Sequence, residues 1–311
     1  MLFKPADDKT PRLRLLEALQ QSTLLDRRQK EWLKSEHVRV KRGLEGEREA
    51  AFHIDSLMRD GPNTAVLHDL RLEVDGETAQ IDHLVFNRML DFILVETKCY
   101  SGDVQINAAG EFTVQYGKAK RHGVASPLAQ SERHGRVLAK VLERVGISGR
   151  LGTRPKFHHL VMFHPKAIIT RPPAESFDTS NVIKADHFAQ WRERWMERAA
   201  GGSAVSALLN LRGRDTLKDW AELLCRAHQP ADLLALPDFM RPAEPQRPLS
   251  PSLAPEPAEA ATADAAEALP RRLICATCGA KLSFAEGRFC WNQPERFGGL
   301  QYCRAHQAAV G

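Results

Sequence analysis

Residues 241–270 constrain the fold of this chain more than any other segment. They read RPAEPQRPLSPSLAPEPAEAATADAAEALP, with 16 proline or alanine residues among 30 and no aromatic residue. Such a segment cannot bury enough apolar surface to offset the conformational entropy that folding removes. We therefore predict a disordered, semi-extended linker over residues 236–270, between a large N-terminal part and a small C-terminal module at residues 271–311.

The composition is that of a globular protein, because 43% of the 311 residues are hydrophobic and 27% are charged. No run approaches 18 consecutive apolar residues, and the first 20 residues carry early acidic groups and no apolar signal core. We therefore expect a cytoplasmic protein without a membrane span. The net charge of +5 permits an anionic partner such as nucleic acid but does not require one.

The order of the predicted elements indicates an α/β fold. Apolar residues at helical spacing predict one or two helices in an N-terminal helical segment, residues 1–40. Consecutive strands then lie between helices instead of alternating with them, so we expect a mixed sheet flanked by helices over residues 41–235. The predicted strands are 64–75, 79–87, 90–98, 103–106, 112–116, 157–163 and a short one within 180–188; the predicted helices are 41–60, 127–145, about 191–196 and 216–227.

Two neighbouring strands carry charged residues within apolar runs. Asp82 lies in QIDHLVF, and Glu96 and Lys98 lie at the end of the next run, LVETKCYSGDV. Residues i and i+2 of a strand share a face, so Glu96 and Lys98 project together, and a hairpin around Asn87–Leu90 would bring Asp82 beside them.

Two carboxylates are the hard oxygen ligands that Mg²⁺ prefers, and the carbonyl of Thr97 would supply another ligand. A bound divalent ion lowers the pKa of a water molecule and makes a nucleophile for phosphodiester hydrolysis. Lys98 would orient that water or offset charge in the transition state.

Two residues on helices point to the same place. Glu47 lies one turn before Ala51, on the apolar stripe of the first predicted helix. Gln130 lies seven residues before Val137, on the apolar stripe of the helix that Ser126 is predicted to cap. We expect both side chains to face the sheet.

The segments GLEGEREAAF, QIDHLVF, VETKCYSGDV and SPLAQ, in this order, resemble the nuclease-related domain, NERD, over about residues 40–150. That family is placed among the PD-(D/E)XK nucleases, which have the restriction-endonuclease-like α/β fold. The resemblance implies cleavage of DNA that depends on Mg²⁺ or Mn²⁺, in DNA processing or defence. Asp82 and Glu96 would hold the ion, Lys98 would position water, Glu47 would orient water or a neighbouring group, and Gln130 would brace the site.

Two residues depart from the pattern of the family. Ile81 stands where the name of the superfamily has proline, and His134 stands where some relatives carry tyrosine. Two alternatives stay open: a catalytically inactive protein that binds nucleic acid with the same fold, and an interaction scaffold with no salt-dependent affinity for DNA.

Four of the six cysteines lie in the last 37 residues. Cys275 and Cys278 form a C-x2-C pair, Cys303 and His306 form a second pair at the same spacing, and Cys290 lies between them. This pattern predicts a tetrahedral Zn²⁺ site that stabilises a module too short to fold alone. The fourth ligand is either His306 or Cys290, and we favour Cys290 because RFC ends a predicted strand and thiolates hold zinc strongly.

The module resembles the small zinc ribbons or fingers that are appended to some nuclease-related proteins and to topoisomerase tails. That resemblance implies contact with DNA. Basic and aromatic residues make such a surface plausible; they are Arg271, Arg272, Lys281, Arg288, Trp291, Arg296, Phe297 and Arg304.

Overall fold

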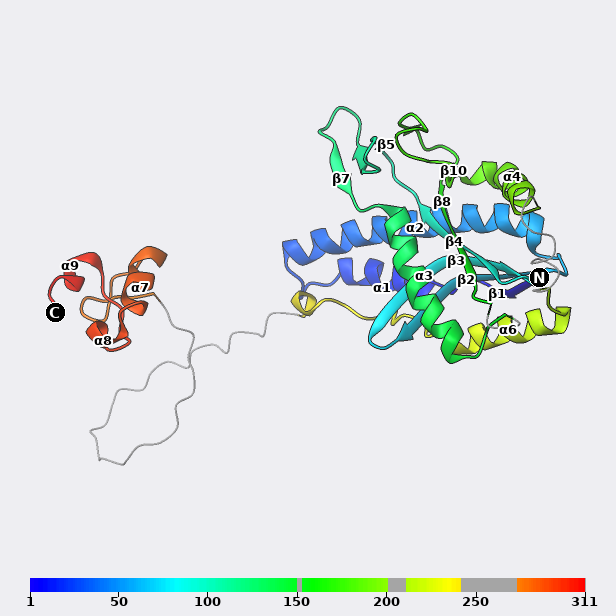
Figure 1. Ribbon diagram of the computed structural model, residues 1–311. Coiled ribbons are helices and arrows are strands. Elements are labelled where there is room, and N and C mark those ends of the chain that lie inside the picture. The colour runs from blue at the N-terminus through cyan, green and yellow to red at the C-terminus, as the bar shows by residue number, and fades with distance from the viewer. Residues whose placement is uncertain (150–152, 201–210, 242–272, 311) are drawn as a thin grey trace. The chain divides into compact units, whose positions relative to one another are not determined.

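A three-stranded antiparallel meander, β2-β3-β4, forms the centre of the large sheet (Figure 1). The meander is extended by parallel strands on both sides, because β1 pairs with β2, β8 pairs with β4 and β10 pairs with β8. The resulting order is β1-β2-β3-β4-β8-β10. The six strands are β1 (Leu2–Lys4), β2 (Thr64–Val74), β3 (Glu77–Asn87), β4 (Asp91–Lys98), β8 (Lys156–Phe163) and β10 (Val182–Lys184).

A second, smaller sheet has the order β7-β6-β5-β9. Its apolar residues pack with Val161, Phe163 and Val182 of the large sheet. The sequence predicted a single sheet, and the structure has two because β5 and β6 pair with each other and not with β4. The strands are β5 (Asp103–Ile106), β6 (Phe112–Gln115), β7 (His122–Val124) and β9 (Ile169–Thr170).

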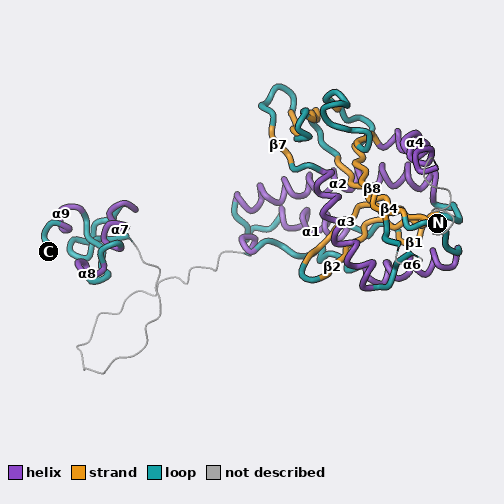
Figure 2. The backbone as a smooth tube through the Cα atoms, viewed as in Figure 1, coloured by secondary structure: helices purple, strands orange, loops and turns teal. Residues whose placement is uncertain are grey.

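Helices cover both faces of the large sheet, as the tube view in Figure 2 shows. α3 (Pro127–Arg144) and α6 (Arg214–Ala227) pack on the face that carries Leu84 and Leu94. α2 (Arg27–Met58) packs on the opposite face together with α4 (Phe188–Ala200), which follows the short helix η2 (Ala185–His187). The predicted α/β class, with a mixed sheet flanked by helices, is confirmed.

The N-terminal residues belong to this same arrangement. α2 runs without interruption across the predicted boundary at residues 40 and 41, and Asp26 and Gln29 form a capping box at its start. α1 (Thr10–Gln20) packs on α2.

The first residues of the predicted linker also pack there, through Leu236 and Met240, the latter in the short helix η3 (Asp238–Met240). Gln29 Nε2 donates to the carbonyl oxygens of Phe239 (2.7 Å) and Arg241 (3.1 Å). The first residues of the predicted linker are therefore ordered against α2.

The structure describes residues 1–149, 153–200, 211–241 and 273–310, so residues 242–270 of the predicted linker lie outside the described residues. This computed structural model divides into two compact units, residues 1–245 and 246–311. No helix among the described residues is long and apolar enough to cross a membrane.

The described residues of the smaller unit, 273–310, form three short helices and an isolated β-bridge between Ile274 and Lys281. Its buried apolar residues include Leu282, Cys290 and Phe297. The RFC segment, which the sequence predicted to end a strand, lies in the first of the three helices. They are α7 (Phe284–Trp291), α8 (Pro294–Phe297) and α9 (Arg304–Gln307).

Candidate functional site

An irregularity in the antiparallel pair β2–β3 places two aspartates at the same level of the sheet. Asp69 has a φ of 53° and interrupts the ladder between the pairs His68–His83 and Leu70–Ile81, opposite Asp82. A left-handed φ is uncommon for a residue other than glycine or asparagine, and such irregularities often redirect side chains.

On both strands, the residues that face α3 and α6 change here from odd-numbered to even-numbered positions or the reverse. On β2 they are Ala65 and Leu67 before the irregularity and Leu70 and Leu72 after it. On β3 the corresponding change lies between Ile81 and Leu84, which brackets Asp82. The two aspartates therefore sit where the regular alternation of the strands breaks.

Asp82 is bound to the adjacent strand β4. The backbone N–H and the hydroxyl of Thr97 both donate to Asp82 Oδ2, at 2.7 and 2.6 Å. Thr97, whose carbonyl was predicted as a metal ligand, thus reaches the site through its N–H and its side chain, while a role for its carbonyl stays a prediction.

Glu96 and Lys98 form a buried pair at the end of β4. Lys98 Nζ donates to Glu96 Oε1 (2.7 Å) and to Gln130 Oε1 (3.2 Å). The ammonium is therefore held in place by Gln130 of α3 as well as by Glu96. The side chain of Glu96 is only 4% exposed and that of Lys98 is 20% exposed. A carboxylate, an ammonium and an amide thus converge from one strand and one helix.

Glu47 reaches the site because α2 approaches the end of β4 closely. A Cβ atom placed on Gly46 would lie 2.8 Å from the Cβ of Cys99, closer than carbon atoms pack. Glycine therefore allows the contact, and the next residue, Glu47, faces inward from the helix, as the apolar stripe predicted.

The acidic residues raise one another's pKa values. Burial first, and then the charges of Asp82 and Glu47, raise the pKa of Glu96 to about 8. Burial and Asp82 likewise raise the pKa of Glu47 to about 7. Burial and the neighbouring carboxylates together therefore disfavour the ionised forms more than the lysines favour them, and a bound cation would lower the free energy of the ionised form.

His134 and Lys98, the two basic side chains beside Glu96, differ in charge: the imidazole is neutral and the ammonium is positive. Burial and the neighbouring cations Arg133 and Lys98 lower the pKa of His134 to about 4, so its ring is neutral at pH 7 and its 3.7 Å approach to Glu96 is not an ion pair. Burial lowers the pKa of Lys98, but Glu96 and Asp82 outweigh burial and raise it overall. Lys98 therefore keeps its positive charge beside Glu96.

The structure brings together all five residues that the sequence assigned to catalysis: Glu47, Asp82, Glu96, Lys98 and Gln130. It also adds two that sequence reasoning missed. Lys9 Nζ donates to Glu47 Oε2 (2.6 Å) and lies 3.3 Å from Asp69 Oδ2. Asp69 Oδ1 accepts a further hydrogen bond from Gln80.

A signal for Asp69 was present in the sequence. The three-residue step from Leu67 to Leu70 breaks the two-residue period that Leu70, Leu72 and Val74 follow, and it brackets Asp69. Lys9 gave no such signal, because it lies in a short polar stretch, PADDKTP, far from the other residues along the chain.

Residues 42–164 match the family model of the nuclease-related domain, NERD. The match covers Glu47, Asp82, Glu96, Lys98 and Gln130 and leaves Lys9 outside. It indicates a nuclease-related function with a nucleic-acid substrate. A search of curated proteins and a search of solved structures found no match.

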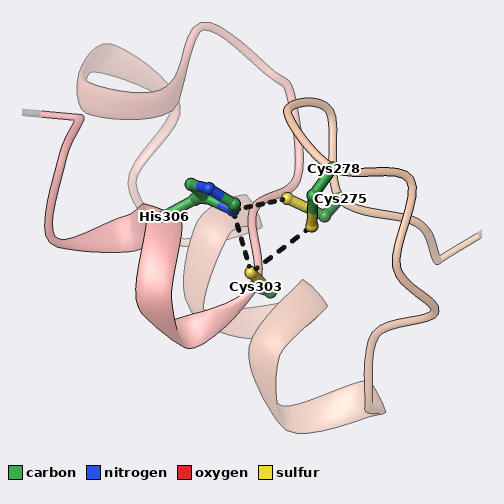
Figure 3. A group of neighbouring side chains, drawn as sticks. All are labelled: Cys275, Cys278, Cys303 and His306. Atoms are coloured by element: carbon green, nitrogen blue, oxygen red, sulfur yellow. Dashed lines mark hydrogen bonds between the residues drawn. The ribbon is translucent and has the colours of Figure 1, made fainter.

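Outside the NERD segment, the C-terminal unit brings three cysteines and a histidine together. The ligand atoms of Cys275, Cys278, Cys303 and His306 all lie within 4.8 Å of one another (Figure 3). The Cys278 and Cys303 sulfurs are 3.9 Å apart, and His306 Nδ1 lies 3.5 Å from Cys275 Sγ and 3.1 Å from Cys303 Sγ. A tetrahedron with Zn–S bonds of about 2.3 Å has edges of roughly 3.8 Å, so these four groups fit Zn²⁺.

Backbone groups prepare this cluster for a cation. Burial raises the pKa of the Cys275 thiol, but backbone N–H groups of Cys303, Cys278 and Thr277 outweigh burial and lower it to about 5. Gly279, with a φ of 67°, allows the tight turn after Cys278, in which the N–H of Gly279 donates to the carbonyl oxygen of Cys275 (2.9 Å). These backbone donors therefore favour the thiolate form of Cys275.

The favoured fourth ligand, Cys290, lies outside the cluster, and His306 takes that position. Cys290 is buried in α7, where its sulfur accepts from the N–H of Tyr302 (3.3 Å) and from Gln307 Nε2 (3.4 Å). Cys290 was favoured because the RFC segment was predicted to end a strand. In the structure this segment is part of α7, which turns the Cys290 sulfur toward the backbone that precedes α9. There the side chain packs and accepts hydrogen bonds.

Proposed function

We propose that this protein is a nuclease that hydrolyses DNA phosphodiester bonds with Mg²⁺ or Mn²⁺, and that its C-terminal module holds a structural Zn²⁺ and contributes to DNA binding. The observation that carries the proposal is the convergence of Asp82, Glu96 and Lys98 at the end of one strand pair, within a segment that matches the nuclease-related domain. Clustered carboxylates with raised pKa values beside a fixed ammonium are typical of metal-dependent phosphoryl chemistry.

Each residue has a role that follows from its contacts. Asp82 and Glu96 would hold the divalent ion, and the two bonds from Thr97 orient the Asp82 carboxylate. When bound, the ion supplies a water of lowered pKa and neutralises charge on the phosphate. Lys98, held by Gln130, donates to the attacking water or to a phosphate oxygen whose negative charge grows in the transition state.

A cationic pocket at the same edge of the sheet supports a nucleic-acid substrate. The pocket has a volume of about 650 Å³, and its lining includes Arg171, Lys184, His187 and Arg194. Lys98 on β4 and Lys184 on β10 both pair with Phe163 of β8, so they lie in one row. Strands are about 4.8 Å apart, which puts the two lysines roughly 10 Å from each other, a length that spans about three nucleotides of one strand.

The second candidate function is nucleic-acid binding without cleavage. One observation favours it: the carboxylates of Glu47 and Glu96 each already have a lysine ammonium within 2.7 Å, so the protein's own cations partly offset the cluster.

The two functions separate in one experiment. Wild type, Lys98→Ala and Arg171→Gln/Arg194→Gln are incubated with linear, circular and single-stranded DNA, with and without Mg²⁺ or Mn²⁺, and affinity is measured by fluorescence anisotropy in EDTA. We expect Lys98→Ala to lower the cleavage rate by about 10²–10³ with affinity unchanged. The arginine variant should lose affinity and show a shallower salt dependence.

Asp82→Ala serves as the metal-ligand control and should abolish cleavage. Full cleavage by Lys98→Ala would refute the mechanism. Salt-dependent binding with no cleavage by wild type in either ion would establish the binding function instead.

A further inference from the structure

Lys9 lies in the candidate active site although it belongs to no part of the matched segment. It is the last residue before α1, and its ammonium bridges Glu47 on α2 and Asp69 on β2 at 2.6 and 3.3 Å. Its side chain is 19% exposed, and that of Asp69 is 5% exposed. A surface lysine that makes a chance ion pair would be far more exposed.

The chain that leads to Lys9 is anchored along the irregular part of β2. Lys4 Nζ donates to the carbonyl oxygens of His68 and Asp69, both at 3.1 Å. Asp7 pairs with Lys4 (2.6 Å) and accepts from His228 Nε2 (3.1 Å) at the end of α6. These contacts hold residues 4–9 against the position where β2 leaves its regular geometry.

The position of the ammonium has the features of a cation site. Two carboxylate oxygens from different elements face it, and Asp82 and Glu96 bring two more carboxylates into the same cluster. Enzymes that use two metal ions hold them about 3.5–4 Å apart between shared carboxylates. In this chain, the ammonium of Lys9 lies between the two carboxylates Glu47 and Asp69, whereas the ammonium of Lys98 contacts only Glu96 of the other pair.

We propose that Lys9 is a resident cation of the site: it occupies the place between Glu47 and Asp69 that a second divalent ion would take, and it limits the site to a single ion held by Asp82 and Glu96. The claim that Asp82 and Glu96 hold one ion rests on the proposed function. The claim that Lys9 blocks a second ion between Glu47 and Asp69 is independent of it, because it follows from the contacts of Lys9 alone.

The test is the stoichiometry of Mn²⁺ binding to the zinc-loaded protein, measured by calorimetry and by electron paramagnetic resonance of free and bound Mn²⁺. We expect one ion per chain for wild type and two for Lys9→Met, with the spectral broadening of a close Mn²⁺ pair. Lys9→Arg keeps the charge and should bind one ion. Lys9→Met/Asp69→Asn removes a ligand of the new position and should return to one.

A folded Lys9→Met protein that binds as many ions as wild type would overturn the proposal. Circular dichroism checks folding, and Lys9→Gln, which keeps hydrogen-bonding capacity without the charge, replaces Lys9→Met if that variant unfolds. A wild type that binds none while the variant binds one would support the role of Lys9 and contradict the metal site of Asp82 and Glu96. The two proposals can therefore fail separately.

Discussion

The carboxylate–lysine cluster of the larger unit and the Cys–His cluster of the smaller unit are organised in opposite ways. The first draws its members from residue 9 to residue 130, and they come from the strands of a sheet that is buried on both faces and from the helices that cover it. The second draws its members from residues 275–306 and has few buried apolar residues around it. Lysines of the chain partly offset the charge of the carboxylates, whereas the cysteine sulfurs lie beside one another, His306 and backbone N–H groups.

The carboxylate–lysine cluster is held together by a fold that is stable without an ion, whereas the smaller unit needs a metal in its Cys–His cluster in order to fold. The larger unit has enough apolar burial to hold four carboxylates together before any ion binds. The smaller unit, with 38 described residues from 273 to 310, lies in the size range where metals supply the folding free energy. Three predictions test this contrast.

Loss of zinc should have the largest effect. Cys303→Ser removes a ligand, and a structural zinc contributes about 10–16 kcal/mol of binding free energy, so the smaller unit should unfold while the larger unit stays folded. Heteronuclear NMR and zinc quantification would show both outcomes in one sample. The matched control is Cys290→Ser, which should keep one zinc per chain, because its sulfur lies outside the cluster; zinc loss in that variant would contradict the Cys3His assignment.

The Glu96 carboxyl and the Cys–His cluster should contribute pH dependences of opposite sign. Burial and Asp82 raise the pKa of Glu96 from 4.5 to about 8, so between these values this carboxyl is protonated in the folded unit and ionised in the unfolded chain. Its contribution to the metal-free stability is therefore fully present below pH 4.5 and is lost, by on the order of 3–5 kcal/mol, as the pH rises toward 8. The proposed Zn²⁺ of the smaller unit should instead dissociate as the pH falls, because protons compete for the cysteine sulfurs and His306.

Urea titrations followed by tryptophan fluorescence at pH 5, 6.5 and 8, in the presence of EDTA, would measure the slope for the larger unit. Between pH 5 and pH 8, wild type should lose more stability, or gain less, than Glu96→Gln. Midpoints that change in parallel for the two proteins would show that burial does not control this carboxyl.

A substitution at the contact between α2 and the end of β4 should have the smallest effect on stability. Gly46→Ala places a Cβ 2.8 Å from that of Cys99 and should destabilise the larger unit by about 1–3 kcal/mol by pushing α2 away from β4. The same substitution three residues earlier, Gly43→Ala, meets nothing closer than 3.9 Å and should be neutral or stabilising by about 0.5–1 kcal/mol. Equal unfolding midpoints for the two variants would show that close packing of α2 does not position Glu47.

Local periodicity explains how much of the site could be predicted. The two-residue period of a strand pairs Glu96 with Lys98, and the helical period turns Glu47 and Gln130 inward. The C-x2-C and C-x2-H spacings identify Cys275, Cys278, Cys303 and His306 as candidate ligands. Each of these inferences needs only the geometry of one element or of one short loop.

Local patterns in the sequence predict the class of the fold, the charged residues of β3 and β4, and the set of thiols and imidazole from which the ligands of the proposed zinc come. Tertiary contacts add Lys9 and Asp69 to the carboxylates and place His306, not Cys290, in the Cys–His cluster. These contacts join residues that are far apart along the chain or that lie in different elements. Lys9 reaches Glu47 because β1 pairs with β2 and residues 4–9 bond to an irregular strand, and Cys290 turns away because α7 packs on the backbone before α9.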